Sequence, residues 1–376
     1  MQYVDEFRDT ARVKEILAQI ATEAQTSREY HLMEFCGSHT YSISKYGLAS
    51  FLPSNIRMIH GPGCPVCVLP MGRLDGAIEL AKRPKVILTT YGDIMRVPAS
   101  NRTNLLQARA EGADIRMVYS CLDSLKIARE NPGHEVVFFA IGFETTTPPT
   151  VTSVLEAERT GLSNYSVYCN HVLTPPAVAH TLESPEVRQL GTFRLDGFLG
   201  PAHVSAIIGS RPFEYFAHEY NRPVVVSGFE PVDVLQGILM LIRQLNEGRA
   251  EVENQYVRAV TRDGNLVAQQ WVAEVFELRP FFEWRGLGKV PYSGLRLKDK
   301  YAKFDAEVKF DLKTQSVPDH KACQCGAILR GLKSPTDCKL FGKVCTPEQP
   351  HGPCMVSSEG SCGAHYRYRR IPDKIG

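Results

Sequence analysis

Eleven cysteines are the residues of this 376-residue chain with the most obvious chemistry. Two of them, Cys64 and Cys67, lie in a loop rich in Gly and Pro, residues 61–67, directly after an apolar run. Gly permits backbone angles that other residues avoid and Pro fixes φ, so we expect a stiff loop. A Cys-x-x-Cys pair between a strand and a helix favours metal binding or thiol redox chemistry. The alternative is two buried thiols in a tight turn.

A third cysteine, Cys36, begins the sequence Cys-Gly-Ser-His. Cys36 and His39 are the residue types of a nucleophile and a nearby base. The same two side chains also suit a site for a soft metal ion. A buried cysteine followed by a turn is the third interpretation. The chain has no Gly-x-Ser-x-Gly elbow that would support hydrolase chemistry.

The largest concentration of thiols lies near the C-terminal end of the chain, between residues 323 and 362. These six are Cys323, Cys325, Cys338, Cys345, Cys354 and Cys362. Their segment is rich in Gly and Pro and has few apolar side chains to offset the entropy of ordering it. A metal centre would supply the missing free energy. The wide spacing favours an iron–sulfur cluster over zinc, which prefers close pairs, and disulfides or free thiols are the remaining alternative.

Eight short apolar runs must position these cysteines. Each run ends in a polar loop that contains Gly, Pro or Cys, and a helical stretch follows. The runs are residues 31–35, 56–59, 85–89, 115–119, 135–141, 165–168, 197–199 and 223–226. Strands that alternate with helices predict parallel sheets covered on both faces. Ligands bind beyond the carboxyl ends of such strands, where nearly every unusual residue of this chain stands.

The order of the runs predicts an α/β protein with two similar parallel-sheet domains that face a cleft. Four runs precede residue 132 and four follow it, and the sequence Asn-Pro-Gly at 131–133 is a suitable boundary. We therefore expect a first α/β domain at residues 1–132 and a second at 133–250. Residues 251–376 would form a C-terminal scaffold that carries the cysteine-rich segment.

Other strand-end residues have two interpretations each. Glu144, followed by three threonines, could bind a polar ligand at a helix N-terminus or simply cap that helix. His171 and His203 could be ligands or proton carriers, or hydrogen-bonded loop histidines. Cys121 and Cys169 are expected to be packed thiols at strand ends.

Composition excludes several classes of function. The net charge of +2 gives no electrostatic basis for binding nucleic acid or a membrane surface. The charged N-terminus lacks the apolar core of a signal peptide, and no apolar run approaches the roughly 20 residues of a membrane helix. We therefore expect a cytoplasmic protein whose cysteines are metal ligands or redox groups. Neither a Gly-x-Gly-x-x-Gly nucleotide loop nor a Walker lysine loop is present.

Five stretches resemble the HypD family, which takes part in the maturation of nickel–iron hydrogenases. They are Cys-Gly-Ser-His-Thr at 36–40, Gly-Pro-Gly-Cys-Pro-Val-Cys at 61–67, Gly-Phe-Glu-Thr-Thr at 142–146, Gly-Phe-Glu-Pro at 228–231 and Met-Val-Ser-Ser-Glu-Gly-Ser-Cys at 355–362. They span nearly the whole chain. One departure is Pro-Ala-His at 201–203, where the family pattern is Pro-Gly-His.

The resemblance implies a scaffold on which an iron atom receives two cyanides and one carbon monoxide. Such a scaffold works with a HypC-like chaperone, receives cyanide from a HypE-like carrier, and holds a 4Fe-4S cluster in its C-terminal part. A stand-alone thiol–disulfide oxidoreductase driven by the cluster is the alternative function. A zinc-stabilised binding module without a redox role is a third.

The resemblance also assigns roles to the cysteines. Cys36, Cys64 and Cys67, with His39 beside them, would form the iron assembly site. The expected cluster ligands are Cys325, Cys338, Cys345 and Cys362. The remaining C-terminal thiols, Cys323 and Cys354, would be a redox pair that relays electrons toward the assembly site by thiol–disulfide exchange.

Overall fold

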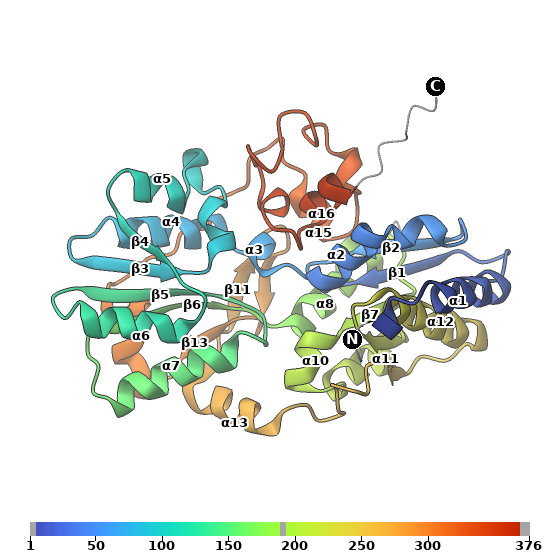
Figure 1. The fold of residues 1–376 in the computed structure, drawn as a ribbon, viewed down its shortest axis with the longest axis horizontal. Coiled ribbons are helices and arrows are strands. Elements are labelled where there is room, and N and C mark those ends of the chain that lie inside the picture. Colours follow the sequence, from blue (N-terminus) through green and yellow to red (C-terminus); the bar gives the residue numbers. More distant parts are fainter. Residues whose placement is uncertain (1–4, 189–192, 369–376) are drawn as a thin grey trace.

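The computed structural model describes residues 5–188 and 193–368, and two wholly parallel sheets organise it (Figure 1). The five-stranded sheet has the order β2 (Ile56–His60), β1 (Tyr30–Glu34), β7 (Gly197–Pro201), β8 (Val224–Ser227) and β9 (Val252–Asn254). The four-stranded sheet has the order β4 (Asp114–Met117), β3 (Val86–Thr90), β5 (Glu135–Gly142) and β6 (Tyr165–His171). All eight predicted strands are confirmed, as is the α/β fold class.

The strands do not divide between the sheets in chain order, and in this respect the predicted boundary at residue 132 is wrong. β1 pairs with β7, from Leu32 opposite Gly197 to Glu34 opposite Leu199. β3 pairs with β4 on one side and with β5 on the other. The boundary would therefore cut the four-stranded sheet between β4 and β5. Apolar runs record where strands occur along the chain but carry no information about which strands pair.

Helices cover both faces of each sheet. Around the five-stranded sheet, which we call the first unit, these are α1 (Thr10–Glu23), α2 (Gly37–Tyr46), α10 (Ala202–Ile208), α11 (Glu214–Tyr220) and α12 (Pro231–Glu247). Around the four-stranded sheet, the second unit, they are α4 (Met71–Ala81), α5 (Leu105–Ala110), α6 (Cys121–Glu130), α7 (Thr147–Arg159) and α13 (Leu266–Val275). No helix in the described ranges is both long and apolar enough to cross a membrane.

The apolar residues of the strands explain why both sheets are buried. Every residue of β6 is buried, and so is every residue of β5 from Val136 to Gly142. Such continuous burial is characteristic of parallel strands that are covered on both faces. In the first unit, α1 packs on α12 over a core that includes Ile20, Leu199 and Ile238.

Two stretches of chain connect the units at their junction, and a third, residues 255–265, joins β9 to α13. The short helix α3 (Pro65–Val68) follows β2 of the first unit and contacts β5 of the second (Figure 1). Residues 172–196 lead back from β6 to β7 and include α8 (Thr174–Leu182) and α9 (Pro185–Arg188). The carboxyl ends of β2 and β5 therefore meet at this junction.

The remainder of the chain packs on this framework. Strands β10 (Phe276–Leu278), β11 (Phe281–Trp284), β12 (Gly288–Pro291) and β13 (Leu295–Leu297) form two small antiparallel pairs, followed by α14 (Ala306–Lys309). The C-terminal segment carries α15 (Cys325–Leu329) and α16 (Ser361–Tyr368). It lies above the junction in Figure 1, with α16 on α2 and the short helix at residues 353–355 on α3.

Candidate functional site

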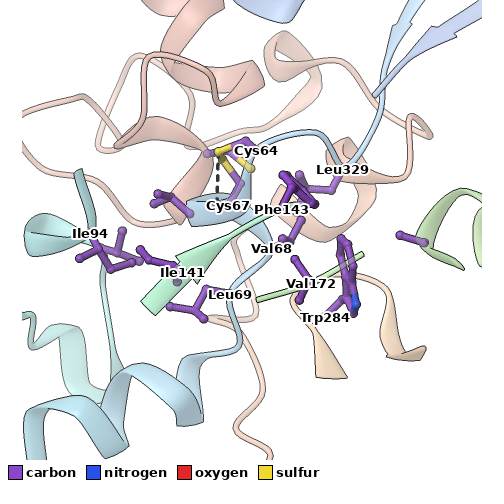
Figure 2. Packing of buried hydrophobic residues seen from close by; sticks show 14 of the residues in the cluster. Cys64, Cys67, Val68, Leu69, Ile94, Ile141, Phe143, Val172, Trp284 and Leu329 are labelled. Atoms are coloured by element: carbon purple, nitrogen blue, oxygen red, sulfur yellow. Dashed lines mark hydrogen bonds between the residues drawn. A yellow bond between two sulfur atoms is a disulfide. The ribbon is translucent and has the colours of Figure 1, made fainter. Parts of the chain in front are cut away.

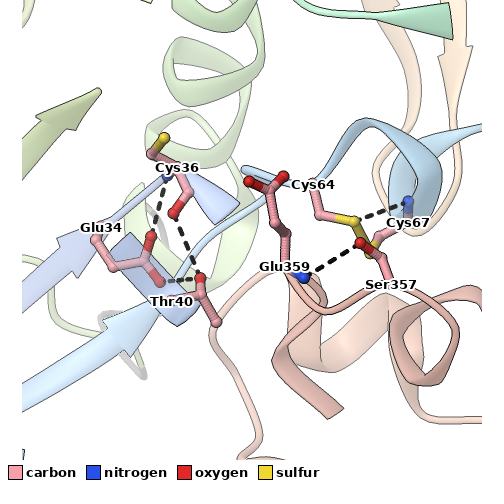
Figure 3. The surroundings of a disulfide bond; sticks show 7 residues. All are labelled: Glu34, Cys36, Thr40, Cys64, Cys67, Ser357 and Glu359. Atoms are coloured by element: carbon pink, nitrogen blue, oxygen red, sulfur yellow. Dashed lines mark hydrogen bonds between the residues drawn. A yellow bond between two sulfur atoms is a disulfide. The ribbon is translucent and has the colours of Figure 1, made fainter. Parts of the chain in front are cut away.

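The end of β1 holds a buried carboxylate, Glu34, that fixes the start of α2. Its side chain accepts hydrogen bonds from Cys36 N at 3.0 Å and from the Thr40 hydroxyl (Figure 3). It also accepts one from His60 Nδ1 at 2.6 Å. Two of these donors follow β1 and the third ends β2. Glu34 therefore ties together two adjacent strand ends and sets the backbone that presents Cys36.

Cys36 lies at the N-cap of α2 and is 8% exposed. Burial raises the pKa of this thiol to about 12, and the nearby Glu359 carboxylate adds to the rise. The sulfur is therefore protonated at neutral pH, which is the opposite of an activated nucleophile. A metal ion bound at the sulfur would displace that proton, because a coordinating thiol is deprotonated. The raised pKa argues against the nucleophile interpretation, and the metal-site interpretation stays a prediction.

His39 does not act as a base toward Cys36 in this arrangement. Its Nε2 lies 3.0 Å from the carbonyl oxygens of both Ser227 and Gly228, so Nε2 carries the proton and donates. Burial lowers the pKa of His39, which keeps the ring neutral. The buried Nδ1 has no hydrogen-bond partner within the described part of the chain. One turn of α2 therefore directs the ring toward β8.

The Cys64–Cys67 pair forms a disulfide in a buried loop. Cys64 is the N-cap of α3, and its sulfur accepts a hydrogen bond from Cys67 N at 3.2 Å. The pair packs among apolar side chains at the junction, including Val68, Ile141 and Phe143 (Figure 2). The predicted proximity of the two sulfurs is present, and the bond between them is the oxidised form of a dithiol.

The two cysteine loops touch through their backbones. Gly37 N donates to Gly63 O at 2.9 Å, and Gly61 N donates to Glu34 O at 2.7 Å. A Cβ at Gly63 would lie 2.4 Å from Cys36 N, so only glycine allows this approach. The structure thus brings Cys36 and the Cys64–Cys67 pair, predicted from separate strand ends, into one place.

Glu359 reaches the same place from the far end of the sequence. Its carboxylate accepts a hydrogen bond from Ser38 Oγ at 2.8 Å, and it lies between Cys36 and Cys64 in the view of Figure 3. Burial raises the pKa of this carboxyl group. The sequence analysis missed Glu359 as a site residue. The only signal was its place inside the stretch at 355–362 that carries the family resemblance.

Five of the six C-terminal thiols interact with one another electrostatically. Cys325 exchanges hydrogen bonds with Cys323 and with Cys354, and these contacts together with burial raise the pKa of both partners. Cys362 lies near Cys354, and Cys345 lies near Cys323 and Cys325. The sixth thiol, on Cys338, is half-buried against the core. A thiol that coordinates a metal ion loses its proton on binding.

The C-terminal thiols have the donor chemistry of an iron–sulfur centre. A Cβ at Gly352 would lie 2.5 Å from Cys325 Sγ and 2.6 Å from Cys323 Sγ, so glycine leaves room beside the sulfurs. Within residues 5–188 and 193–368, no three His, Cys, Asp or Glu side chains converge on one metal-ion position. The thiolates of a cluster bind separate irons and have no such common point. Which four thiols are ligands remains a prediction.

Other residues predicted at strand ends are structural. Both carboxylate oxygens of Glu144 accept from Thr174, through its N at 2.8 Å and its Oγ1 at 2.9 Å. Glu144 therefore caps α8 and not the helix that follows it in sequence. His171 Nε2 lies 2.9 Å from Thr150 Oγ1, and burial lowers the pKa of His171 to about 4. His203 stacks on Phe229 and is not joined to the cysteines by any contact in the described ranges.

Comparison with known proteins identifies the family. The model described as "HypD: Hydrogenase formation hypA family" matches residues 11–369. The chain is 63% identical over 373 residues to "Hydrogenase maturation factor HypD" of Cupriavidus necator, covering 99% of this chain and 98% of that one. It is 45% identical over 375 residues to the protein with the same description from Escherichia coli (strain K12), covering 98% and 99%. The chain belongs to the HypD family.

Proposed function

We propose that this protein is a hydrogenase maturation factor on which iron acquires two cyanides and one carbon monoxide for a nickel–iron hydrogenase. The observation that carries the proposal is the contact between the Cys36 loop and the Cys64–Cys67 loop at the junction of the two units. Thiolates are soft, strongly donating ligands, which suit low-spin iron with cyanide and carbon monoxide. The iron group is the cargo of this site, to be passed on to the hydrogenase.

We infer that Cys36 binds the iron and loses its proton on doing so. Glu359 is a suitable acceptor for that proton, since its buried carboxylate lies near Cys36 and has a raised pKa. Reduction of the Cys64–Cys67 disulfide takes up two electrons and two protons and yields two thiols, which become available as further ligands. The loop therefore couples a change of redox state to a change in the number of iron ligands.

We infer that Cys325, Cys338, Cys345 and Cys362 hold a 4Fe-4S cluster, which supplies single electrons when bound. Cys323 and Cys354 form the accompanying redox pair in this proposal. Their contacts with Cys325 support a role beside the cluster. A dithiol there would pass its electrons toward Cys64 and Cys67 by thiol–disulfide exchange.

The proposed partners follow from the same chemistry. Iron and cyanide have to be delivered to a buried thiol, which calls for a HypC-like chaperone and a HypE-like cyanide carrier. We place the protein in the cytoplasm, where free thiols such as those of the C-terminal segment persist. The alternative, a stand-alone thiol–disulfide oxidoreductase, would need neither partner.

Complementation tests the maturation role directly. In cells that lack their own copy of the protein, Cys36→Ser is expected to abolish hydrogenase activity. The matched control is Cys121→Ser, which removes another buried thiol that donates a hydrogen bond to Pro149 O. Cys121 is distant in sequence from both cysteine loops. Activity that survives in Cys36→Ser would contradict the assembly site. Rapid turnover of small disulfides by the purified protein alone would favour the oxidoreductase.

Metal analysis of anaerobically purified protein tests the cluster. About four irons with matching sulfide, and a broad visible band that bleaches on reduction, are expected. Zinc without sulfide would favour the binding-module alternative. Cys354→Ser is expected to retain the visible band but to impair reduction of the Cys64–Cys67 disulfide. Loss of the band in that variant would show that Cys354 is a ligand.

A further inference from the structure

A pocket of about 530 Å³ lies beside the cysteine-rich segment, and its lining includes none of the cysteines of the proposed iron assembly site. Its walls include the apolar side chains of Met71, Pro98 and Pro318. Its polar lining includes Arg102, His320 and His351, and no Asp or Glu is among the described residues that line it. The pocket therefore combines apolar lining residues with a neighbouring group of one arginine and two histidines.

The hydrogen bonds of the two histidines determine which ring nitrogens are free. Arginine can only donate, so His351 Nε2, 3.2 Å from Arg102 Nη2, is an acceptor, and its Nδ1 donates to Gln349 O at 3.3 Å. His320 Nδ1 accepts from Ala322 N at 3.3 Å, so Nε2 carries the proton, and this donor has no hydrogen-bond partner among the described residues. The pocket thus offers donors and no free acceptor from these rings.

Arg102 is held at the pocket in an unfavourable backbone conformation. Both Asn101 and Arg102 have positive φ, 56° and 61°, where residues with a Cβ are rare. The preceding residue, Ser100, is fixed by two hydrogen bonds to Asp75, at 3.0 and 2.7 Å. No carboxylate in the described part of the chain forms an ion pair with the Arg102 guanidinium. Strained residues of this kind concentrate at ligand clamps.

We propose that this pocket binds a small organic anion, a carboxylate or a phosphate monoester with an apolar body. The charged group accepts charge-assisted hydrogen bonds from the guanidinium N–H groups of Arg102 that His351 does not occupy, and a further hydrogen bond from His320 Nε2–H. The apolar body lies against Met71, Pro98 and Pro318. This inference stands on the pocket alone and does not rest on the proposed maturation function.

The pocket also adjoins the thiols. The peptide N–H of His351 donates to Cys345 Sγ at 3.3 Å, and the His351 ring contacts Arg102. His351 therefore joins the proposed anion site to one of the C-terminal cysteines. We therefore expect a ligand in the pocket to change the surroundings of Cys345, and this change is a second measure of binding.

Calorimetric titration of the full-length protein tests the proposal, with benzoate and phenyl phosphate as probes and benzamide as the uncharged control. The two anions are expected to bind at millimolar concentration or below, and benzamide at least about tenfold more weakly, since a charge-assisted hydrogen bond is lost. Equal binding of benzoate and benzamide, or no binding of either anion at millimolar concentration, would overturn the proposal.

Matched variants assign the binding to Arg102. Arg102→Gln is expected to weaken both anions about tenfold or more, whereas Arg109→Gln, which removes an exposed arginine of α5 outside the pocket, leaves binding unchanged. Asn101→Gly relieves the backbone strain and keeps the charge, so it retains binding and unfolds at a higher temperature. Arg102→Gly also unfolds at a higher temperature but loses binding. Unchanged binding in both Arg102 variants would contradict the assignment.

Discussion

Two cysteine-bearing regions of this molecule are positioned by different means. Cys36 and the Cys64–Cys67 pair follow strands of one parallel sheet, and backbone hydrogen bonds between their loops fix the spacing. The described residues 313–368 contain short helices and turns but no strand, and their thiols contact one another. The first region is thus positioned by the fold, whereas we expect the order of the second to depend on metal binding by its cysteines. Ligand loss should therefore affect the two regions very differently.

Removal of the metal centre proposed above should give the largest effect. With chelation, or in Cys325→Ser, we expect backbone amides of residues 313–368 to lose protection from hydrogen exchange, because metal binding supplies the ordering free energy of such a segment. Amides of β1 and β2 should stay protected. Hydrogen exchange with mass spectrometry measures both regions at once.

The Cys121→Ser variant is the control for that experiment, since its thiol is buried in the second unit and far from the segment in sequence. Equal loss of protection in both cysteine regions would break the comparison. It would mean that the C-terminal segment also holds the sheets together.

The second effect concerns the region shaped by the fold. Gly63→Ala is expected to lower the free energy of unfolding by about 3 kcal/mol, because its Cβ would meet backbone atoms of Phe35 and Cys36 at 2.4 Å. Gly133→Ala is the matched control, since nothing lies within 4 Å of a Cβ there. Urea denaturation compares the two. Equal stability of both variants would show that the contact between the cysteine loops is not tight.

The third prediction concerns a buried carboxyl group outside both cysteine regions, Glu144, whose pH dependence gives a reference for the framework that carries them. Burial raises the pKa of Glu144 from 4.5 to about 7, so the folded state keeps a proton that the unfolded chain releases between these values. The free energy of unfolding therefore falls as pH rises through this window. Glu144→Gln removes that loss and should gain on the order of 2 kcal/mol relative to the native protein between about pH 5 and pH 7.

Thermal or urea unfolding at several pH values measures this difference. Asp114→Asn is the comparison, because the Arg116 side chain lowers the pKa of that carboxyl group and the sign of its pH dependence is opposite. A difference between Glu144→Gln and the native protein that is constant with pH would contradict the assignment.

The smallest effect tests the link between the regions. Ser38 Oγ donates to Glu359 Oε1 and joins the start of α2 to the C-terminal segment. A double-mutant cycle with Ser38→Ala and Glu359→Gln should give a coupling of about 1 kcal/mol, the usual net value of one hydrogen bond. A coupling near zero would mean that this hydrogen bond does not contribute to the stability of the folded protein.

The sequence predicted the parts of this structure that depend on local pattern. Eight of the nine strands in the two parallel sheets were predicted from apolar runs, and β9 was missed. The rule that ligands bind at the carboxyl ends of parallel strands correctly predicted that Cys36 and Cys64 lie near one another. The pairing of β1 with β7 could not be predicted, because no local feature records which distant strand is a neighbour. The domain boundary was misplaced for this reason.

Within the site, the missed residues are those whose role depends on distant partners. Glu34 and Glu359 are ordinary acidic residues in the sequence and become significant only where β1, α2 and the C-terminal segment meet. The orientation of the His39 ring also could not be predicted from the sequence. Its ring is fixed by carbonyl oxygens of Ser227 and Gly228, nearly two hundred residues further along the chain.

The interleaved strand order has a consequence for synthesis. β1 and β2 leave the ribosome early, but β1 has no partner on its other side until β7 is made. At roughly 5–20 residues per second that wait is on the order of ten seconds or more. The four-stranded sheet, whose strands are all made in the meantime, can form first. A nascent chain that stops near residue 132 therefore ends with two incomplete sheets and open edges, the state in which strands aggregate.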